Sequence, residues 1–174
     1  ITHEKKLFIT KARYVSKDKI IFALISNEVI LYDFIKNEIL WQRQINTSRF
    51  SDFALDESKT KMALTDESGE IFLINVKDGK LLKTLTGQNV DNIFQVDYKN
   101  GVIVGAGQDR RVSIYNDNTT KSSYTKSEFL VYSVGLSPSA NLAAYSANED
   151  NDIKIINAKT YSNLYNFKLC FQFI

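Results

Sequence analysis

The sequence VYSVGLSPSANLAAYSANEDNDIKIIN, residues 131–157, predicts three short β-strands separated by two turns. The first strand, 132–136, ends at Ser137-Pro138-Ser139, where the proline ring presets one backbone dihedral for a tight turn. The second strand, 142–146, ends in the polar run 148–151, and the third strand covers 152–157. The fold follows if this unit recurs at a fixed interval.

The unit does recur, and its marker is an apolar residue followed by Asp or Asn at the end of the third strand. The marker occurs as Tyr32-Asp33, Ile74-Asn75, Tyr115-Asn116 and Ile156-Asn157. The intervals between successive markers are 42, 41 and 41 residues. Repeats of about 40–45 residues with four strands each are typical of propeller blades. The sequence therefore predicts an all-β fold, a β-propeller of four-stranded antiparallel blades with about four blades present.

At these markers the chain resembles the WD-repeat β-propeller family, with Tyr-Asp, Ile-Asn, Tyr-Asn and Ile-Asn in place of the Trp-Asp dipeptide. The resemblance implies that turn aspartates hydrogen-bond to backbone amides and hold the hairpins. The residues given such structural roles are Asp33, Asn75, Asp109, Asn116, Asp150 and Asn157. Where the family usually has Gly-His before a blade, this chain has Gly87-Gln88, which removes the histidine of the family's hydrogen-bonded network. The Lys-, Ile- and Asn-rich character is also similar to the WD-repeat accessory proteins of bacterial periplasmic nitrate reductase systems.

We expect the whole chain to be one propeller domain. The expected blades are 11–46, 49–86, 90–126 and 129–168, with 5–10 as the outer strand of a preceding blade and 169–174 as the start of a further blade. Propellers close with about four to eight blades, so we expect the chain to be part of a larger ring. The alternatives are a complete four-bladed ring closed by residues 5–10 and a dimer that shares a ring of eight blades.

Composition and charge limit the classes of partner expected for this chain. The chain has 174 residues, 44% of them hydrophobic, and a formal net charge of +2 with acids and bases interleaved. That charge pattern gives no basic stripe for nucleic acid, and no apolar run is long enough to insert into a membrane. The single cysteine, Cys170, allows no internal disulfide and leaves the compartment open, with the periplasm favoured by the resemblance and the cytoplasm as the alternative.

Few residues suggest catalysis. The single histidine, His3, and the single cysteine cannot form a zinc site, and no phosphate loop, nucleophile elbow or dinucleotide fingerprint occurs. We therefore predict a protein that is not an enzyme and has no cofactor or metal. The alternative is a propeller-type hydrolase or lactonase, or a small-molecule-binding propeller, with channel carboxylates such as Asp52 around a calcium ion. Asp56, Asp66 and Glu67 are interpreted instead as turn residues.

Binding of another protein or peptide is the predicted function, as a scaffold or as an assembly or accessory factor. In WD-repeat propellers, the loops that enter a blade and the loops between its second and third strands share one face. Transferred by position, the interaction face comprises Arg13, Arg49, Phe50, Asp66, Glu67, Gln108, Arg110, Arg111, Asn148, Glu149 and Asn151, with Asp52, Gln95 and Ser133 directed toward the channel. Arg110-Arg111 could meet carboxylates bidentately, and arginine and aromatic residues are favoured at interface hot spots. An incomplete ring would also allow self-association.

Overall fold

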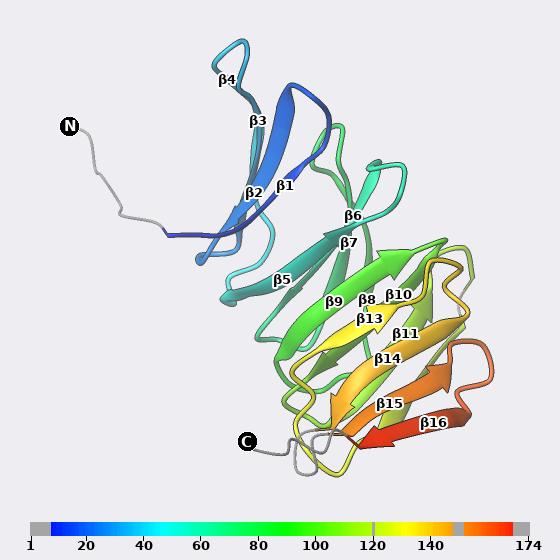
Figure 1. Cartoon of the computed structure of the whole chain (residues 1–174). Helices are drawn as coiled ribbons and strands as arrows, with labels where there is room; N and C mark the ends of the chain where they lie inside the picture. The colour runs from blue at the N-terminus through cyan, green and yellow to red at the C-terminus, as the bar shows by residue number, and fades with distance from the viewer. Residues whose placement is uncertain (1–7, 120, 148–151, 169–174) are drawn as a thin grey trace, which may run out of the picture.

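The computed structural model describes residues 8–119, 121–147 and 152–168, and within these ranges it contains sixteen strands in four antiparallel sheets (Figure 1). Each sheet consists of four strands that are consecutive in sequence and neighbours in space. The predicted all-β propeller with four-stranded blades is therefore confirmed. No helix in the described ranges is long and apolar enough to cross a membrane.

We number the blades in chain order. Blade 1 consists of β1 (Ile9–Tyr14), β2 (Lys19–Leu24), β3 (Glu28–Asp33) and β4 (Glu38–Gln44). Blade 2 consists of β5 (Phe50–Leu55), β6 (Lys61–Asp66), β7 (Ile71–Asn75) and β8 (Leu81–Leu85). Blade 3 consists of β9 (Ile93–Lys99), β10 (Val102–Gly107), β11 (Arg111–Asn116) and β12 (Ser122–Lys126). Blade 4 consists of β13 (Val134–Leu136), β14 (Leu142–Ala147), β15 (Asp152–Asn157) and β16 (Asn163–Lys168).

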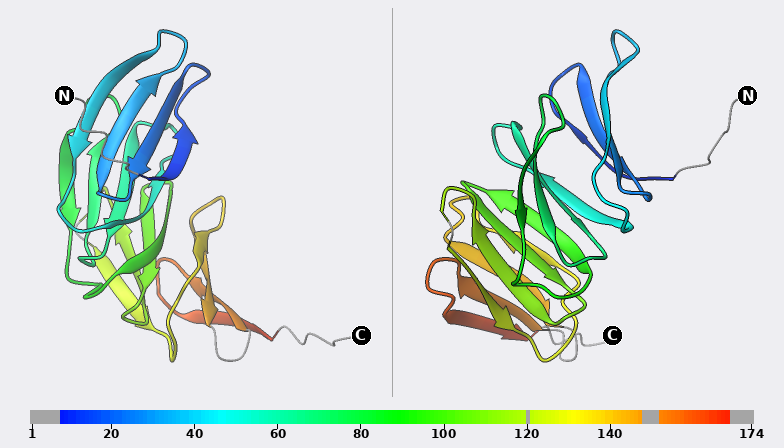
Figure 2. Two further views of the ribbon diagram at one scale, coloured as in Figure 1. Left: turned by 90° about the vertical axis from the view of Figure 1, so that its left-hand side faces the viewer. Right: turned by 180° about the vertical axis from the view of Figure 1, so that it is seen from behind.

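The blades follow one another along an open arc, with blade 1 at one end and blade 4 at the other (Figures 1 and 2). The closed four-bladed ring is therefore wrong for this structure, because the first and last blades do not meet. The expected outer strand at 5–10 is also wrong for its last two residues. Ile9 pairs with Leu24 in an antiparallel ladder, so Ile9 and Thr10 begin the inner strand of blade 1. Residues 5–7 and 169–174 lie outside the described residues.

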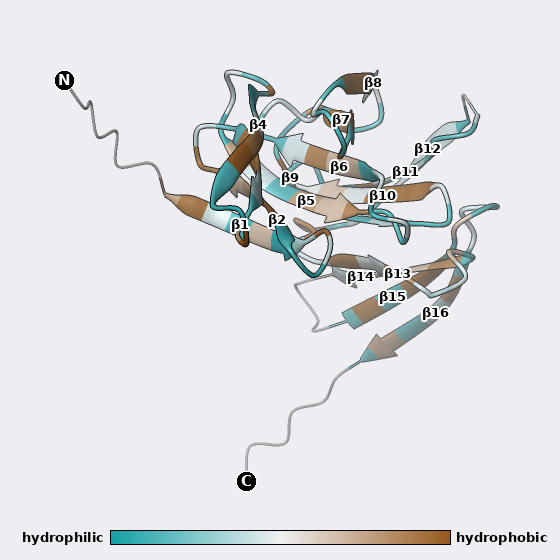
Figure 3. Cartoon of the chain, turned by 90° about the horizontal axis from the view of Figure 1, so that it is seen from above, coloured by the Kyte–Doolittle hydropathy of each residue, from teal (hydrophilic) through white to brown (hydrophobic). Residues whose placement is uncertain are grey.

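The core is divided among three seams, each formed where two neighbouring blades pack face to face. Central strands such as β6 are buried on both sides because each blade between two others turns one face toward each neighbour. Seam 1–2 contains Trp41 and Met62, seam 2–3 contains Tyr98, and seam 3–4 contains Tyr145. Hydrophobic segments accordingly follow central strands such as β10, whereas the connecting turns are largely hydrophilic (Figure 3).

Candidate functional site

The Asp or Asn of each marker is the last residue of a third strand, and its side chain bonds to the turn that follows. Asp33 Oδ1 accepts hydrogen bonds from the amides of Ile35 and Lys36, at 3.1 and 2.9 Å. The side-chain oxygens of the other three markers accept equivalent turn amides. They are Asn75 from Lys77, Asn116 from Asn118, and Asn157 from Lys159 and Thr160. The marker side chains are thus engaged within their own blades.

A hydrogen-bonded network ties blade 3 to the loop that enters it. Asn89 Nδ2 donates to both oxygens of the Asp109 carboxylate, at 3.2 and 3.3 Å, and Ser113 Oγ donates to Asn89 Oδ1. The amides of Val90 and Arg111 also donate to Asp109, at 2.9 and 3.0 Å. Asp150, the corresponding aspartate of blade 4, lies outside the described residues.

Asn89 is a residue that the sequence reasoning missed. Gln88 occupies the position where the family usually has the histidine. In the structure, Gln88 Nε2 donates to Ser122 Oγ at 3.2 Å and takes no part in the Asp109 network. Blade 2 repeats the Asn89 arrangement, since Asn46 Nδ2 donates to Asp66 at 3.0 Å. The recurrence of asparagine at positions 46 and 89, one blade apart, was the signal that could have found it.

The side chains expected to point into the channel instead connect adjacent inner strands. Asp52 Oδ2 accepts the amide of Val96 at 3.1 Å, and Gln95 Oε1 accepts the amide of Val134 at 2.9 Å. Lys11 Nζ also donates to Asp52 from blade 1. Polar side chains of one inner strand thus satisfy backbone donors at the edge of the next, which stabilises the order of the blades. Ser133 is exposed and precedes β13.

The acidic residues considered for a calcium site do not gather around a common position. Asp52 is paired with Lys11, whereas Asp56 accepts the amides of Thr60 and Lys61 in its own turn, each at 2.7 Å. Asp66 is buried in the turn network of blade 2. In the described part of the chain, no three acidic, histidine or cysteine side chains form a group that could hold a metal ion.

Besides the buried Asp66, two further residues of the expected interaction face are engaged within the fold. Phe50 is buried and packs edge-to-face against Phe53, with ring centroids 6.2 Å apart, so its expected place on an exposed face is wrong. Arg111 stacks on Tyr124 with 4.4 Å between its guanidinium carbon and the ring centroid, and it donates to Gln88 O at 2.8 Å. The two arginines therefore do not act as a pair, because Arg111 is occupied within blade 3.

The remaining predicted residues divide between two regions. Arg49, Gln108 and Arg110 are exposed on the loops that enter blades or join second to third strands. Arg49 lies 3.8 Å from the carboxylate of Glu67, in an exposed ion pair. Arg13 belongs to β1 and lines a cavity of about 480 Å³ along the inner strands, away from these loops. Asn148, Glu149 and Asn151 lie outside the described residues.

An aromatic pair with one exposed and one half-buried ring completes this loop face. Phe94 and Tyr132 stack with ring centroids 5.2 Å apart and an interplanar angle of 7°. Phe94 is the extra residue of a β-bulge in β9, since Ile93 pairs with Gly107 and Gln95 with Ala106. Both rings lay in ordinary apolar strand patterns, so sequence reasoning gave them no functional role.

Hydrogen bonds join the loops around this pair. The Gln108 amide donates to Asn92 O at 2.9 Å, and the Val131 amide donates to Gly107 O at 3.2 Å. We call the exposed and half-buried side chains on these loops the rim patch, which consists of Val90, Phe94, Gln108, Arg110, Phe129 and Tyr132. Val90 and Tyr132 are 65% and 50% exposed. Large apolar surface therefore remains in contact with solvent on these loops.

Arg110 has an unusual backbone conformation. Its φ is 63°, in the left-handed region that disfavours side chains, whereas Gly69 takes the equivalent turn position in blade 2 with a φ of 81°. The guanidinium donates to Glu128 O at 3.4 Å and otherwise faces solvent. Arg110 is one of seven described non-glycine residues with a positive φ, and its side chain is exposed.

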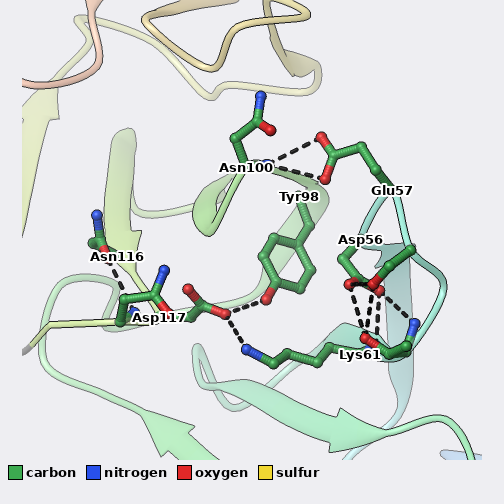
Figure 4. A network of polar contacts seen from close by, with 10 residues as sticks. Asp56, Glu57, Lys61, Tyr98, Asn100, Asn116 and Asp117 are labelled. Carbon is green, nitrogen blue, oxygen red and sulfur yellow. Dashed lines mark hydrogen bonds and ion pairs between the residues drawn. The ribbon is translucent and has the colours of Figure 1, made fainter.

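A second polar cluster lies at the other end of blades 2 and 3 (Figure 4). The buried carboxylate of Asp117 accepts hydrogen bonds from Lys61 Nζ, at 2.7 Å, and from the Tyr98 hydroxyl. Burial and, next, the bond to Asp117 raise the pKa of the Tyr98 hydroxyl above its usual value. These groups bond to one another across seam 2–3, and we assign them a structural role.

Comparisons with known proteins identify the fold. No family model and no curated protein matches the sequence. Among solved structures, a chain in a crystal structure of the mitotic checkpoint complex is similar, with a TM-score of 0.82 and 17% identity. The match covers 95% of this chain and 52% of that chain, so the present chain spans about half the length of the neighbour. The likeness shows the propeller fold and supports the resemblance to WD-repeat propellers.

Proposed function

We propose that this chain is a non-enzymatic propeller segment that binds another protein or peptide through the rim patch. The observation that carries the proposal is the stacked pair Phe94–Tyr132, in which Tyr132 is half exposed and Phe94 half-buried, on the same loop face as the exposed Arg110. Aromatic rings give large contact area at a low cost in conformational entropy, and arginine adds directional hydrogen bonds. Both residue types are enriched at the energetic centres of protein interfaces.

Two further observations favour a protein partner. The structural neighbour is itself a chain of a protein complex. The basic and acidic side chains of this chain are interleaved, with a formal net charge of only +2, which does not favour nucleic acid. The hydrolase alternative has less support, because the Asp52 carboxylate is already bonded by Lys11 and by the amide of Val96.

The narrower role stays a prediction from the sequence. An assembly or accessory function, of the kind found in periplasmic nitrate reductase systems, rests on the general character of the sequence. The same holds for a periplasmic location and for a ring completed by further blades or by a second copy.

The test compares rim variants with a matched aromatic control. Tyr132→Ser removes half of the stacked pair in the rim patch, whereas Tyr165→Ser disrupts another exposed stacked pair, Tyr165–Phe167, on β16. We expect affinity capture from native extract, read by quantitative mass spectrometry, to recover a partner with the wild type and the Tyr165→Ser control. The Tyr132→Ser variant should lose it. Recovery of no partner, or equal recovery by all three proteins, would contradict the proposal.

Arg110→Gly separates binding from folding at the same patch. Glycine adopts the left-handed conformation without strain, so we expect the free energy of unfolding to stay unchanged or rise by up to about 1 kcal/mol. Partner binding should nevertheless weaken, because the guanidinium is lost. Urea denaturation and a titration of the captured partner measure the two effects. A variant that loses stability and keeps full affinity would show that Arg110 serves the fold and not the interface.

A further inference from the structure

A second concave surface lies at seam 1–2, on the opposite side of the blades from the rim patch. It is a groove of about 700 Å³ between the outer part of blade 1 and the turns of blade 2. Leu31 and Leu40 of blade 1 form one wall, and Val76 and Leu82 of blade 2 form the other. Leu82 is 49% exposed, so the groove offers apolar surface directly to solvent.

The seam below holds the walls in place. The buried Trp41 donates from Nε1 to Val76 O at 2.9 Å, which fixes the start of the β7–β8 turn to blade 1. Gly79 closes that turn with a φ of 69°, and a Cβ added there would lie 2.7 Å from the Trp41 ring. The turn therefore packs tightly on the indole, and the groove is formed before any ligand binds.

The groove is lined by basic side chains. Its lining includes four lysines, Lys19, Lys59, Lys61 and Lys77, and no carboxylate. Lys19 lies 3.0 and 3.9 Å from Asp18 and Asp33, and Lys61 is bound to Asp117. Among the described residues, Lys59 and Lys77 form no ion pair. A surplus of positive charge thus surrounds an apolar surface, in a chain whose charges otherwise nearly balance.

The corresponding grooves at the other seams are smaller and less basic. Those at seams 2–3 and 3–4 have volumes of about 220 and 350 Å³, and each is lined by only two lysines. The repeat architecture alone therefore does not produce the lysine-rimmed groove at seam 1–2. Its size and charge are specific to the residues that blades 1 and 2 place there.

We propose that this groove binds an extended peptide segment of a partner protein in which leucine-like side chains alternate with Asp or Glu. The apolar walls would take the leucine-like side chains, and Lys59 and Lys77 would meet the carboxylates. Charge complementarity selects the acidic sequence, and the shape and apolar walls select a peptide over an inorganic anion. This proposal does not depend on the rim patch, because no residue belongs to both surfaces.

The test starts from a phage-displayed random peptide library selected on the immobilised wild-type chain and counter-selected on the Leu82→Glu variant. We expect enrichment of sequences that alternate apolar and acidic residues. Fluorescence anisotropy of one enriched, fluorescein-labelled peptide should then show binding that weakens roughly tenfold when the salt concentration rises from low to about 0.5 M, because ion pairs at a surface are screened.

Matched variants localise the peptide. The adjacent Leu81 is 54% exposed and does not line the groove, so Leu81→Glu is the control for Leu82→Glu. Lys80→Glu/Lys83→Glu carries the same charge change as Lys59→Glu/Lys77→Glu but at lysines outside the groove. We expect the groove variants to bind the peptide at least about tenfold more weakly and the controls to bind within about twofold of the wild type.

Three outcomes would overturn the proposal. One is the absence of enriched peptides, and another is enrichment of sequences without acidic residues. The third is equal loss of affinity in the groove variants and their controls. Dodecanoate serves as a further probe by isothermal titration calorimetry. Binding of dodecanoate that depends on Leu82 and Lys77, with no peptide selected, would assign the groove to a small amphipathic acid and reject the peptide.

Discussion

Seams 1–2 and 2–3 join the same kinds of blade face but are built differently. Seam 1–2 is fastened by a large ring, Trp41, whose indole reaches the backbone of blade 2, and it leaves an apolar groove open to solvent. Seam 2–3 is fastened by a buried carboxylate, Asp117, which binds Lys61 of blade 2 and Tyr98 of blade 3. Both of these bonds go to Asp117 Oδ2, whereas the buried Oδ1 has no hydrogen-bond partner among the described residues.

The difference between the two seams indicates how a repeat fold can use some residues for stability and leave others able to bind a ligand. A buried carboxylate needs all of its partners, so the surface around Asp117 is committed to the fold. An indole satisfied by one backbone carbonyl needs no charged partner, so the lysines near Trp41 remain able to bind a ligand. Lys61 touches both regions, since it lines the groove and binds Asp117.

The largest expected effect is on seam 1–2. Trp41→Ala should lower the free energy of unfolding by about 3–5 kcal/mol, because truncation of a buried aromatic side chain leaves a cavity. Trp41→Phe should cost only about 1 kcal/mol, mainly for the lost hydrogen bond to Val76 O. Urea denaturation followed by circular dichroism measures both. Equal losses for the two variants would mean that the hydrogen bond, and not the packing, holds the seam.

A smaller loss is expected on seam 2–3. Asp117→Ala leaves the Tyr98 hydroxyl without its acceptor and Lys61 without its anion. Since the Lys61 side chain is about one-third exposed, we expect a loss of about 2 kcal/mol, below the range for fully buried pairs. The double variant Asp117→Ala/Lys61→Met should recover part of that loss, because the unpaired ammonium is gone. A double variant less stable than Asp117→Ala alone would show that Lys61 stabilises the fold through other contacts.

The smallest expected effect is a pH dependence carried by Tyr98. Its pKa is raised in the folded chain, by burial first and by Asp117 second, from an unfolded value of 10.0. Above pH 10 the unfolded chain therefore releases the phenol proton while the folded chain retains it, and stability falls as pH rises. Below pH 10 the contribution is fully present.

Tyr98→Phe should reduce this slope, by at most about 1.4 kcal/mol per pH unit for one proton. Some slope should remain, because burial also raises the pKa of Tyr115 and Tyr145. The exposed Tyr165 provides the control variant, Tyr165→Phe, which should keep the slope of the wild type. Urea denaturation at several pH values between 8 and 11 makes the comparison. An unchanged slope in Tyr98→Phe would contradict the role given to the buried hydroxyl.

Much of the fold was predictable because its signals are local. The spacing of the markers, the alternation within strands and turn residues such as Asp33 and Gly79 depend on neighbours a few residues away in sequence. In blade 4, β14 (Leu142–Ala147) and β15 (Asp152–Asn157) accordingly agree with the predicted 142–146 and 152–157 to within a residue. The exception in blade 4 is β13, which is limited to Val134–Leu136 and does not include Tyr132.

The sites were less predictable, because they depend on residues far apart in sequence. The position of Phe50 in the sequence predicted that it lies on the interaction face. The register of β5 instead directs its ring into seam 1–2. Arg111 was expected to act beside Arg110, but Tyr124 of the next strand takes up its guanidinium. The Phe94–Tyr132 stack joins two blades and leaves no local pattern in the sequence.

The sequence by itself determined the blade repeat, the antiparallel strands and the turn chemistry, since each blade is a local unit folded from about forty consecutive residues. Only the tertiary structure decided which face of each blade meets its neighbour. It therefore also decided which polar groups are hydrogen-bonded or ion-paired within the seams. The ion pair between Lys61 and Asp117, 56 residues apart, joins blades 2 and 3 across one seam. The indole of Trp41, bonded to a carbonyl 35 residues away, leaves the other with its basic groove.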